Sequence, residues 1–361
     1  MRIIHVITAF GIGGAEKLLK NIVNKQVKEH DVYLVYFKDK NDLVAELDKK
    51  VHIKQIPFSR HITRNLKSFY EQVQPDIIHT HLGHADLLGI WSARKTKAAL
   101  FCTMHNIYFK KNYLDFFFFK LYTFLFLSAA KNTHVISISK AVENHVINKL
   151  KVPKERSYIL KNAISPKVIE KKNELKDTIR LLFVGRLEKQ KSVETLLKAI
   201  ATLNNKQLKK EFELTIVGDG SLKKELEVLS RKLKIDHLVT FKGEQKNVDA
   251  YYSTSDIFIL PSIFEGFGIV IIEAFRAKLA VIASNIEGPA ELIENDKNGL
   301  LFPVKNENAL ANKIELLIIN KAKRKELIDN GYKTFTKDYH IDTYVEKLNN
   351  LYIDVYNQKD S

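Results

Sequence analysis

The chain has 361 residues, 45% of them hydrophobic and 28% charged, so at roughly 100–200 residues per domain it is long enough for two domains. This composition excludes a disordered tail, a collagen-like fibre and a small disulfide-stapled scaffold. The formal charge of +16 is uneven: residues 1–170 hold 27 basic and 14 acidic side chains, whereas residues 171–361 hold 31 and 28. Such an excess favours nucleic acid, a membrane surface or a phosphorylated ligand as partner, although the lysine-rich bias of an AT-rich genome would also raise the total.

The sequence favours a cytoplasmic location on three grounds. Cys102 is the only cysteine, which excludes an intrachain disulfide and suits a reducing compartment. The first ten residues contain one basic side chain and no small-residue cleavage site, so we interpret them as a first strand and not as a signal peptide. The most apolar stretch, residues 114–127, is shorter than the ~20 residues that a membrane-spanning helix needs.

Short runs of β-branched or aromatic residues alternate with amphipathic stretches in the first half of the chain. Strands are expected at residues 3–7, 32–36, 77–79, 99–103 and 134–138, with a helix at residues 18–27. Nearly continuous apolar strands separated by helices are typical of a parallel sheet covered on both faces. Residues 1–165 are therefore predicted to form a doubly wound α/β domain.

A charged stretch at residues 166–178 is predicted to be a linker, because it lacks an apolar cluster. A second series of strands follows at residues 179–185, 213–218, 238–241, 257–260 and 280–283, and it defines a second domain at residues 179–338. Residues 339–361 have the spacing of an amphipathic helix. The fold class is thus α/β with two Rossmann-like domains, and a ligand cleft is expected between them at the carboxyl ends of the strands.

A glycine-rich turn, Gly11-Ile12-Gly13-Gly14-Ala15-Glu16, joins the first strand to the first helix. Glycines at this position let backbone amides approach an anion at the positive end of the helix dipole. The full dinucleotide fingerprint G-x-G-x-x-G is not met, and a tight turn without a ligand is the alternative.

Two cations follow the first strand of the second half. Arg186 lies in Gly185-Arg186-Leu187, and Lys191 comes five residues later, before a helix that Ser192 is expected to cap. The planar fork of arginine and the point charge of lysine together suit a diphosphate. A solvated loop without a ligand is the alternative.

A further loop combines carboxylates with glycines. Glu265-Gly266-Phe267-Gly268 follows a strand, and Glu273 comes eight positions after Glu265 at the end of an apolar run. Because burying an unpaired charge is costly, Glu273 is expected to face the cleft, with a basic partner as the alternative. Two carboxylates beside backbone amides could hold sugar hydroxyls and a phosphate.

Taken together, these motifs resemble the retaining glycosyltransferases of family 4, the group 1 transferases, which have the GT-B fold. The segment from Glu265 to Glu273 is similar to the E-x7-E signature of that family, and Gly185-Arg186-Leu187 with Lys191 stands in the family's order. The resemblance spans nearly the whole chain and is strongest at residues 180–303. Further motifs in the same order are Gly13-Gly14-Ala15-Glu16, Gly218-Asp219-Gly220, Gly288 with Glu291, and Asn298-Gly299-Leu300.

The resemblance implies that the second domain binds the donor. Arg186 and Lys191 would bind the diphosphate and offset the charge on the leaving nucleotide, and Glu273 would hold the ribose hydroxyls. Glu265 would contact the transferred sugar, either as a nucleophile or as an orienting group. The amides of Gly266, Phe267 and Gly268 would meet sugar hydroxyls or the phosphate.

The resemblance also assigns roles to the first domain. Gly13 and Gly14 would approach the diphosphate, and His105 would lie near the reaction centre on the acceptor side, with a purely structural histidine as the alternative. The C-terminal helix would cross back to this domain. Departures from the family pattern occur in loop and hinge positions, at Ser192, at residues 277–280, and at Ala163 and Ser165.

No metal and no cofactor besides the nucleotide sugar are expected. Transferases of the other common fold hold a metal with an Asp-x-Asp motif, which this sequence lacks. Fixed cations and amides would instead stabilise the leaving diphosphate. Retention of anomeric configuration is implied by the resemblance.

The basic excess lies in the domain that would select the acceptor. Arg60, Arg64 and Lys67 fall on one helical face by spacing, and Lys110 and Lys111 precede a run of four phenylalanines. Such a surface suits anionic lipid headgroups or a lipid-diphosphate acceptor, at ~1 kcal/mol per basic residue near a membrane. A helix packed on its own sheet with a solvated basic face is the alternative.

We therefore expect a cytoplasmic glycosyltransferase, peripheral to the inner face of the cell membrane, that extends a glycan or lipid-linked acceptor of capsule, lipopolysaccharide or exopolysaccharide. A nucleotide-sugar epimerase or isomerase of similar fold is one alternative. A basic nucleic-acid-binding protein is another, but the sequence shows no nucleic-acid-binding signature, so no such partner is expected.

Overall fold

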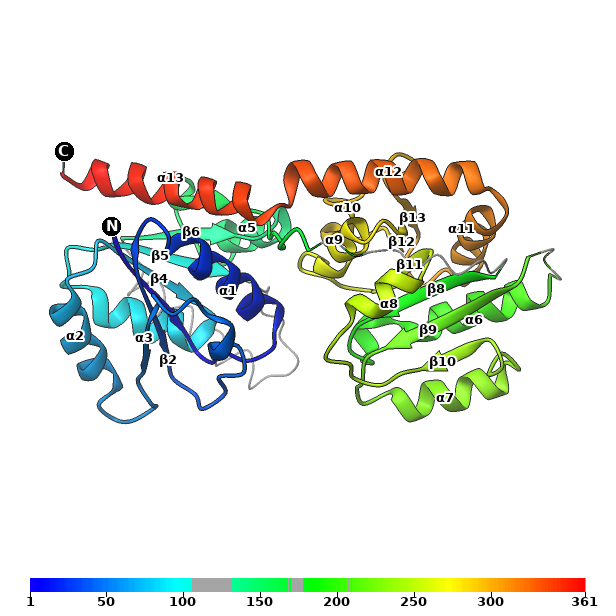
Figure 1. The fold of residues 1–361 in the computed structure, drawn as a ribbon, viewed down its shortest axis with the longest axis horizontal. Coiled ribbons are helices and arrows are strands. Elements are labelled where there is room, and N and C mark those ends of the chain that lie inside the picture. Colours follow the sequence, from blue (N-terminus) through cyan, green and yellow to red (C-terminus); the bar gives the residue numbers. More distant parts are fainter. Residues whose placement is uncertain (106–131, 168, 170–177, 207, 209, 361) are drawn as a thin grey trace. The chain divides into compact units, whose positions relative to one another are not determined.

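The chain folds into two compact units in a computed structural model (Figure 1). Unit 1 comprises Met1–Ser165 and Ile341–Ser361, and unit 2 comprises Pro166–His340. The structure describes residues 1–105, 132–167, 169, 178–206, 208 and 210–360. Lys110 and Lys111 of the predicted acceptor surface, and most of the predicted linker, lie outside these ranges. Among the described helices, none combines the length and the apolar character needed to cross a membrane.

Unit 1 is built, in its described part, on a seven-stranded sheet whose neighbouring strands are all parallel. The order β3-β2-β1-β4-β5-β6-β7 runs in opposite directions from β1 and β4, so the topological switch point lies between these two strands. The strands are β1 (Arg2–Ile7), β2 (Asp31–Tyr36), β3 (His52–Gln55), β4 (Ile77–His81), β5 (Ala99–Met104), β6 (Thr133–Ser137) and β7 (Ser157–Ile159).

The C-terminal helix completes the core of unit 1. It packs beside α1 and over β5, where its apolar stripe buries Tyr344, Leu348 and Tyr352 against a cluster that includes Ile22 and Phe101 (Figure 1). The apolar spacing of this segment is that of one helix face, which explains why the stripe packs as a unit. The α-helices in the described part of unit 1 are α1 (Gly14–Gln26), α2 (Ile62–Val73), α3 (Gly83–Ala93), α5 (Lys140–Asn148) and α13 (Ile341–Asp360).

Unit 2 has, in its described part, a six-stranded parallel sheet in the order β10-β9-β8-β11-β12-β13, with its switch point between β8 and β11. Its strands are β8 (Ile179–Val184), β9 (Phe212–Val217), β10 (Val239–Phe241), β11 (Ile257–Leu260), β12 (Ala280–Ser284) and β13 (Leu300–Phe302). Its helices are α6 (Val193–Asn204), α7 (Lys223–Lys232), α8 (Asp249–Thr254), α9 (Ile269–Arg276), α10 (Glu287–Ala290), α11 (Glu307–Ile319) and α12 (Lys321–Asp338).

The two doubly wound sheets confirm the predicted pair of Rossmann-like α/β domains, but three local predictions are wrong. Helix α1 begins at Gly14, four residues before the predicted start, because the glycine turn itself supplies the first helical turn. Arg60 precedes α2, which begins after a turn closed by the Ile62 amide and the Ser59 carbonyl, so Arg60 does not share a helical face with the other basic residues. Ser192 does not cap α6 with its side chain: its φ is +48°, outside the extended conformation usual for a capping residue, and its hydroxyl lies 2.9 Å from that of Thr195.

Candidate active site

Apart from Glu273, the predicted donor-binding residues of unit 2 lie in turns and loops at the carboxyl edge of its sheet. Arg186 and Lys191 follow β8, and the loop of residues 265–268 follows β11. These two strands are neighbours and flank the switch point, which is where doubly wound sheets bind their ligands. The topology therefore brings together loops that are far apart in the sequence.

Lys191 and Glu265 form an ion pair between these two loops. The Lys191 ammonium donates to Glu265 Oε1, and the Ser262 hydroxyl donates to the same oxygen over 2.8 Å. The two charged side chains are only 14% and 10% exposed. Each would be costly to bury alone, so the pair fixes a cation at the sheet edge. An ammonium has three N–H donors, which leaves it able to bind a phosphate as well.

Arg186 is an exposed cation in the turn directly after β8. Within the described part of the chain, no carboxylate pairs with its guanidinium. Lys191 folds back toward the same turn, and its Cε lies 3.5 Å from where a Cβ on Gly185 would stand. Arg186 lies in this turn and the Lys191 side chain reaches it, so one turn carries the two cations that recognition of a diphosphate would require.

Glycines allow the loops of this edge to pack closely on one another. A Cβ on Gly218 would lie 1.9 Å from the carbonyl oxygen of Gly185, and one on Gly220 would lie 2.5 Å from that of Leu187. A Cβ on Gly288 would lie 2.6 Å from the carbonyl oxygen of Glu265. The glycines after β9 and β12 thus hold the loops after β8 and β11 in place from either side.

The loop after β11 presents backbone amides at the start of α9. Gly268 has a φ of +90°, a conformation that glycine adopts without strain, and it precedes the first helical residue. Among the described residues, the amides of Phe267 and Gly268 have no hydrogen-bond partner. The Phe267 side chain is buried and meets the Tyr339 ring edge-on. A buried side chain anchors a backbone whose amides are oriented by the helix for an anion.

Glu273 lies on α9 and is half-buried. Its Oε2 accepts a hydrogen bond of 3.0 Å from the hydroxyl of Tyr252, a fully buried residue of α8. Burial, followed by the charge of Glu273, raises the pKa of Tyr252 well above its usual value, so this hydroxyl remains a donor. The tyrosine hydroxyl thus orients the Glu273 carboxylate.

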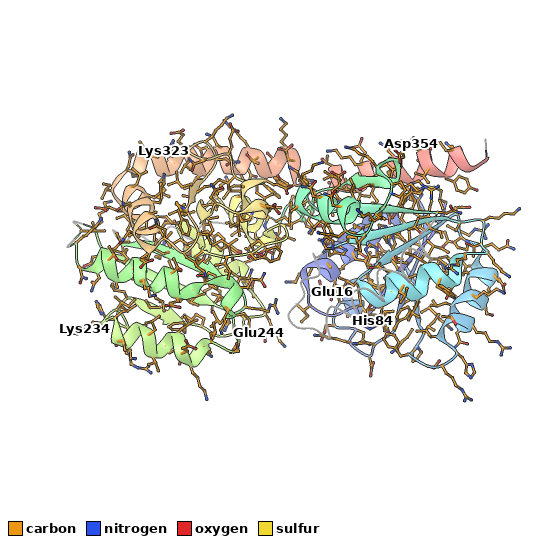
Figure 2. The ribbon with its side chains drawn as sticks, turned by 180° about the vertical axis from the view of Figure 1, so that it is seen from behind. Glu16, His84, Lys234, Glu244, Lys323 and Asp354 are labelled. Atoms are coloured by element: carbon orange, nitrogen blue, oxygen red, sulfur yellow. The ribbon has the colours of Figure 1, made fainter. Side chains whose placement is uncertain are left out.

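The glycine turn of unit 1 leads directly into α1. Gly13 is the residue before α1, and a Cβ there would lie 2.1 Å from a carboxylate oxygen of Glu16. Figure 2 labels Glu16, which lies in the first turn of α1. Around Gly14, by contrast, a Cβ would meet no atom within 4 Å. A Cβ at position 13 would have to displace only the flexible end of the Glu16 side chain, and one at position 14 would meet nothing, so packing does not require glycine at either position.

His105 follows β5 at the carboxyl edge of the unit 1 sheet, in contact with other histidines. Its Nε2 lies 3.5 Å from Nδ1 of His81, while its Nδ1 is buried and has no hydrogen-bond partner within the described residues. Burial lowers the pKa of His105 to about 4, so the ring is neutral at pH 7.

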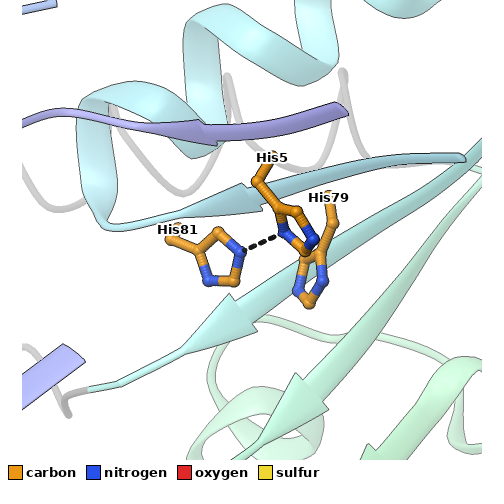
Figure 3. Close-up of side chains that lie close together, drawn as sticks. All are labelled: His5, His79 and His81. Atoms are coloured by element: carbon orange, nitrogen blue, oxygen red, sulfur yellow. Dashed lines mark hydrogen bonds between the residues drawn. The ribbon is translucent and has the colours of Figure 1, made fainter. Parts of the chain in front are cut away.

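His105 belongs to a cluster of histidines that was not predicted from the sequence. His5, His79 and His81 are buried side by side on β1 and β4, at the switch point of the sheet (Figure 3). A signal was present, because residues 79 and 81 alternate on one strand and must share a face. The position of His5 beside them could not be read without knowing that β1 and β4 are neighbours.

The predicted acceptor surface is only partly described. Arg64 and Lys67 are exposed on α2, and Lys67 lies 3.5 Å from Glu71. The opposite face of α2 buries Leu66 and Tyr70 in unit 1. This part of the surface has the arrangement of a helix packed on its own domain with a solvated basic face.

Two family models match consecutive parts of the chain. Glycosyltransferase Family 4 matches residues 12–168, and Glycosyl transferases group 1 matches residues 165–334. The chain belongs to this glycosyltransferase family. It is therefore an enzyme of the sugar-transferring class EC 2.4, as the sequence predicts.

Two named relatives match this glycosyltransferase over more than nine-tenths of its length. The chain is 28% identical to a Campylobacter jejuni alpha-1,4-N-acetyl-D-galactosaminyltransferase whose name gives a PP-undecaprenol acceptor, over 99% of both chains. It is 26% identical to an Escherichia coli UDP-Gal:alpha-D-GlcNAc-diphosphoundecaprenol alpha-1,3-galactosyltransferase, over 91% of this chain and 90% of the relative.

The solved structures confirm the fold class. The glycosyltransferase superposes on Anabaena HepE in complex with UDP with a TM-score of 0.85 and 18% identity, over 97% of this chain and 99% of that chain. The predicted GT-B fold class is thereby confirmed.

Proposed function

We propose that this glycosyltransferase moves a sugar from a nucleotide-diphosphate sugar to a glycan or lipid-diphosphate acceptor, with retention of configuration and without a metal ion. The observation that supports this most strongly is that Arg186 and the Glu265-paired Lys191 belong to one turn at the switch point of unit 2. As the sugar–phosphate bond breaks, negative charge grows on the diphosphate. Cations that are already fixed in place stabilise that charge without reorganisation.

Glu265 acts in this proposal as an orienting group. Its Oε1 accepts hydrogen bonds from both Lys191 and Ser262, which fixes the carboxylate and leaves its other oxygen for the transferred sugar. The partly paired Glu273 holds the ribose, and the amides of residues 266–268 meet the phosphate. Gly13, Gly14 and His105 are assigned to the donor and acceptor contacts of unit 1.

A lipid-diphosphate acceptor is proposed on two grounds. The names of both relatives specify an acceptor linked to undecaprenol through a diphosphate. The basic excess of this chain lies in residues 1–170, and it would attract a diphosphate or an anionic membrane surface. We place the enzyme accordingly in surface polysaccharide synthesis, at the cytoplasmic face of the membrane.

The donor is tested by thermal denaturation of the full chain with a panel of UDP-, GDP- and TDP-sugars, each in EDTA and in Mg2+. We expect one donor to raise the melting temperature equally in both. A shift that appears only with Mg2+ would contradict metal independence. Hydrolysis or epimerisation of the donor without any transfer to a lipid-diphosphate acceptor would contradict the proposed reaction.

The site is tested by Lys191→Met, with Lys189→Met as the matched control, because Lys189 is an exposed lysine on the same turn. We expect Lys191→Met to lower kcat by roughly 100- to 1000-fold, the usual effect of removing one group that stabilises transition-state charge. The control should retain activity. Glu265→Gln should reduce kcat because it removes the ion pair with Lys191. If the variant loses all activity and a glycosyl-enzyme can be trapped in the parent protein, Glu265 is instead a nucleophile.

A further inference from the structure

A buried hydrogen-bonded chain in unit 1 ends at His105. His5 is the register partner of His79, and His81 lies two residues further on the same strand, so the three rings share one face of the sheet (Figure 3). His5 Nδ1 lies 3.1 Å from His81 Nε2, and His81 Nδ1 lies 3.5 Å from His105 Nε2. At the opposite end, His5 Nε2 lies 2.8 Å from Oε1 of Gln26.

Three clustered histidines raise the possibility of a metal site, since His5, His79 and His81 each offer a nitrogen within 4.8 Å of the others. Their nitrogens, however, are already engaged. His79 pairs with the Tyr352 hydroxyl through Nδ1 and with the Thr103 hydroxyl, at 2.7 Å, through Nε2. A metal would have to replace these bonds and those of the chain, so the geometry favours a network of neutral imidazoles.

Gln26 sets the direction of the chain. Its amide nitrogen donates to Asn349 Oδ1 of α13 over 2.7 Å, which turns its carbonyl oxygen toward His5. This contact with α13 holds the amide in one orientation.

The orientation of Gln26 determines the position of each proton along the chain. A carbonyl oxygen can only accept, so His5 must carry its proton on Nε2, and its Nδ1 must accept from His81. Burial lowers the pKa of His5 to about 4 and that of His81 well below its usual value, so each ring has a single N–H. His81 then accepts through Nδ1 from the Nε2–H of His105. Nδ1 of His105 is left without a proton.

We propose that Gln26, His5 and His81 are positioning residues that hold His105 in the Nε2–H tautomer, with its Nδ1 presented as a hydrogen-bond acceptor to a hydroxyl of the sugar substrate. The use of that nitrogen in catalysis rests on the proposed function, whereas the tautomer itself does not. Nδ1 of His105 is a buried acceptor without a partner among the described residues, which is the state expected of a site that a substrate hydroxyl completes.

The tautomer is tested by two-bond 15N–1H correlation spectra of the full chain labelled with 15N-histidine, in which His105 is identified by the signal lost in His105→Gln. The parent protein is expected to show His105 with its proton on Nε2. Gln26→Met, which removes the acceptor opposite His5, should shift His105 to a mixture of tautomers. Thr103→Val is the matched control, because it disturbs His79 of the same cluster but not the chain to His105.

Two spectral results would overturn the proposal: a proton on Nδ1 of His105 in the parent, or a Gln26→Met spectrum in which His105 is unchanged. Should Gln26→Met fail to fold, the parent spectrum alone decides. Stoichiometric Zn2+ that survives dialysis of the parent and is lost in His79→Gln would replace the network by a metal site.

Kinetics with the donor identified by thermal denaturation test whether the tautomer of His105 matters for catalysis. Gln26→Met should lower kcat roughly 10- to 100-fold, the usual effect of losing a group that orients a functional histidine, with little change in the donor KM. A changed tautomer with unchanged kcat would reject the role of His105 in the proposed function while leaving the hydrogen-bonded chain intact.

Discussion

The two units share one topology but fill their switch points with different chemistry. Between β8 and β11, unit 2 has glycine loops, backbone amides without a hydrogen-bond partner among the described residues, and a cation held by a carboxylate. On β1 and β4, unit 1 has buried imidazoles that bond to one another and, through His79, to Tyr352 of α13. The comparison shows that a doubly wound sheet fixes where a site lies, while the residues at the strand ends decide whether it holds charge or neutral hydrogen bonds.

The largest expected consequence of this difference is that acid destabilises unit 1. The pKa of His5 and of His105 is lowered by burial to about 4, below the 6.5 of an unfolded histidine, and that of His79 and His81 is lowered as well. Protons therefore bind the unfolded chain first. The stability from these groups is complete above pH 6.5 and is lost as the pH falls toward 4, by up to about 3 kcal/mol for each of His5 and His105.

Trp91 allows this to be measured, because it is the only tryptophan and lies on α3 of unit 1. Urea unfolding followed by its fluorescence should show a midpoint that falls steeply between pH 7 and pH 5. His79→Gln should reduce that dependence. A pH dependence of the midpoint that is the same in His79→Gln as in the parent would mean that the cluster is not held neutral by burial.

The next largest expected effect is a loss of packing in unit 2. Gly218→Ala would place a Cβ 1.9 Å from a backbone oxygen, at a residue whose φ of +136° already disfavours a side chain. Neither backbone can yield easily, so we expect a loss of about 4 kcal/mol or more. Circular dichroism should show a melting temperature lower by roughly 10 °C. A variant that melts within a degree of the parent would show that this close approach is not required.

The sequence was sufficient for the fold and for the identity of the candidate residues in unit 2, because buried parallel strands are apolar runs and the loop motifs are local. It was not sufficient for the partners of those residues. Lys191 and Glu265 are 74 positions apart, and Tyr252 and Glu273 are 21 apart, so both pairs depend on which loops and helices pack together. For the same reason the sequence could not predict the contact of Gln26 with Asn349, 323 positions away.

A smaller effect concerns Asp86, a buried carboxyl on α3 of unit 1. Burial raises its pKa to about 7, against a usual value near 3.8, although Thr80 opposes this. The folded state thus resists ionisation, and its stability falls as the pH rises from 4 to 7. Asp86→Asn should stabilise unit 1 at pH 8 by at most about 4 kcal/mol and have no benefit below pH 4.

The Asp86 prediction is checked by urea unfolding at pH 8 and pH 4, again through Trp91. Asp39→Asn is the control, because Asp39 is exposed and its neutralisation should leave the midpoint unchanged at either pH. Equal midpoints for parent and Asp86→Asn at pH 8 would show that Asp86 is not held protonated by burial.

The smallest expected effect on stability is that of Gly14→Ala, which tests whether the glycine turn of unit 1 is needed for folding or for binding a ligand. A Cβ at Gly14 would touch nothing within 4 Å, and position 14 is the first residue of α1, where alanine is the better helix former. Gly14→Ala should therefore leave unit 1 as stable as before, or more stable by about 0.5–1 kcal/mol. If the glycine serves a ligand, the same substitution should raise the donor KM, because the methyl group occupies the space through which the diphosphate reaches the amides. A variant with parent-like stability and parent-like KM would remove Gly14 from the donor site, whereas a loss of stability would show that the turn needs glycine for folding.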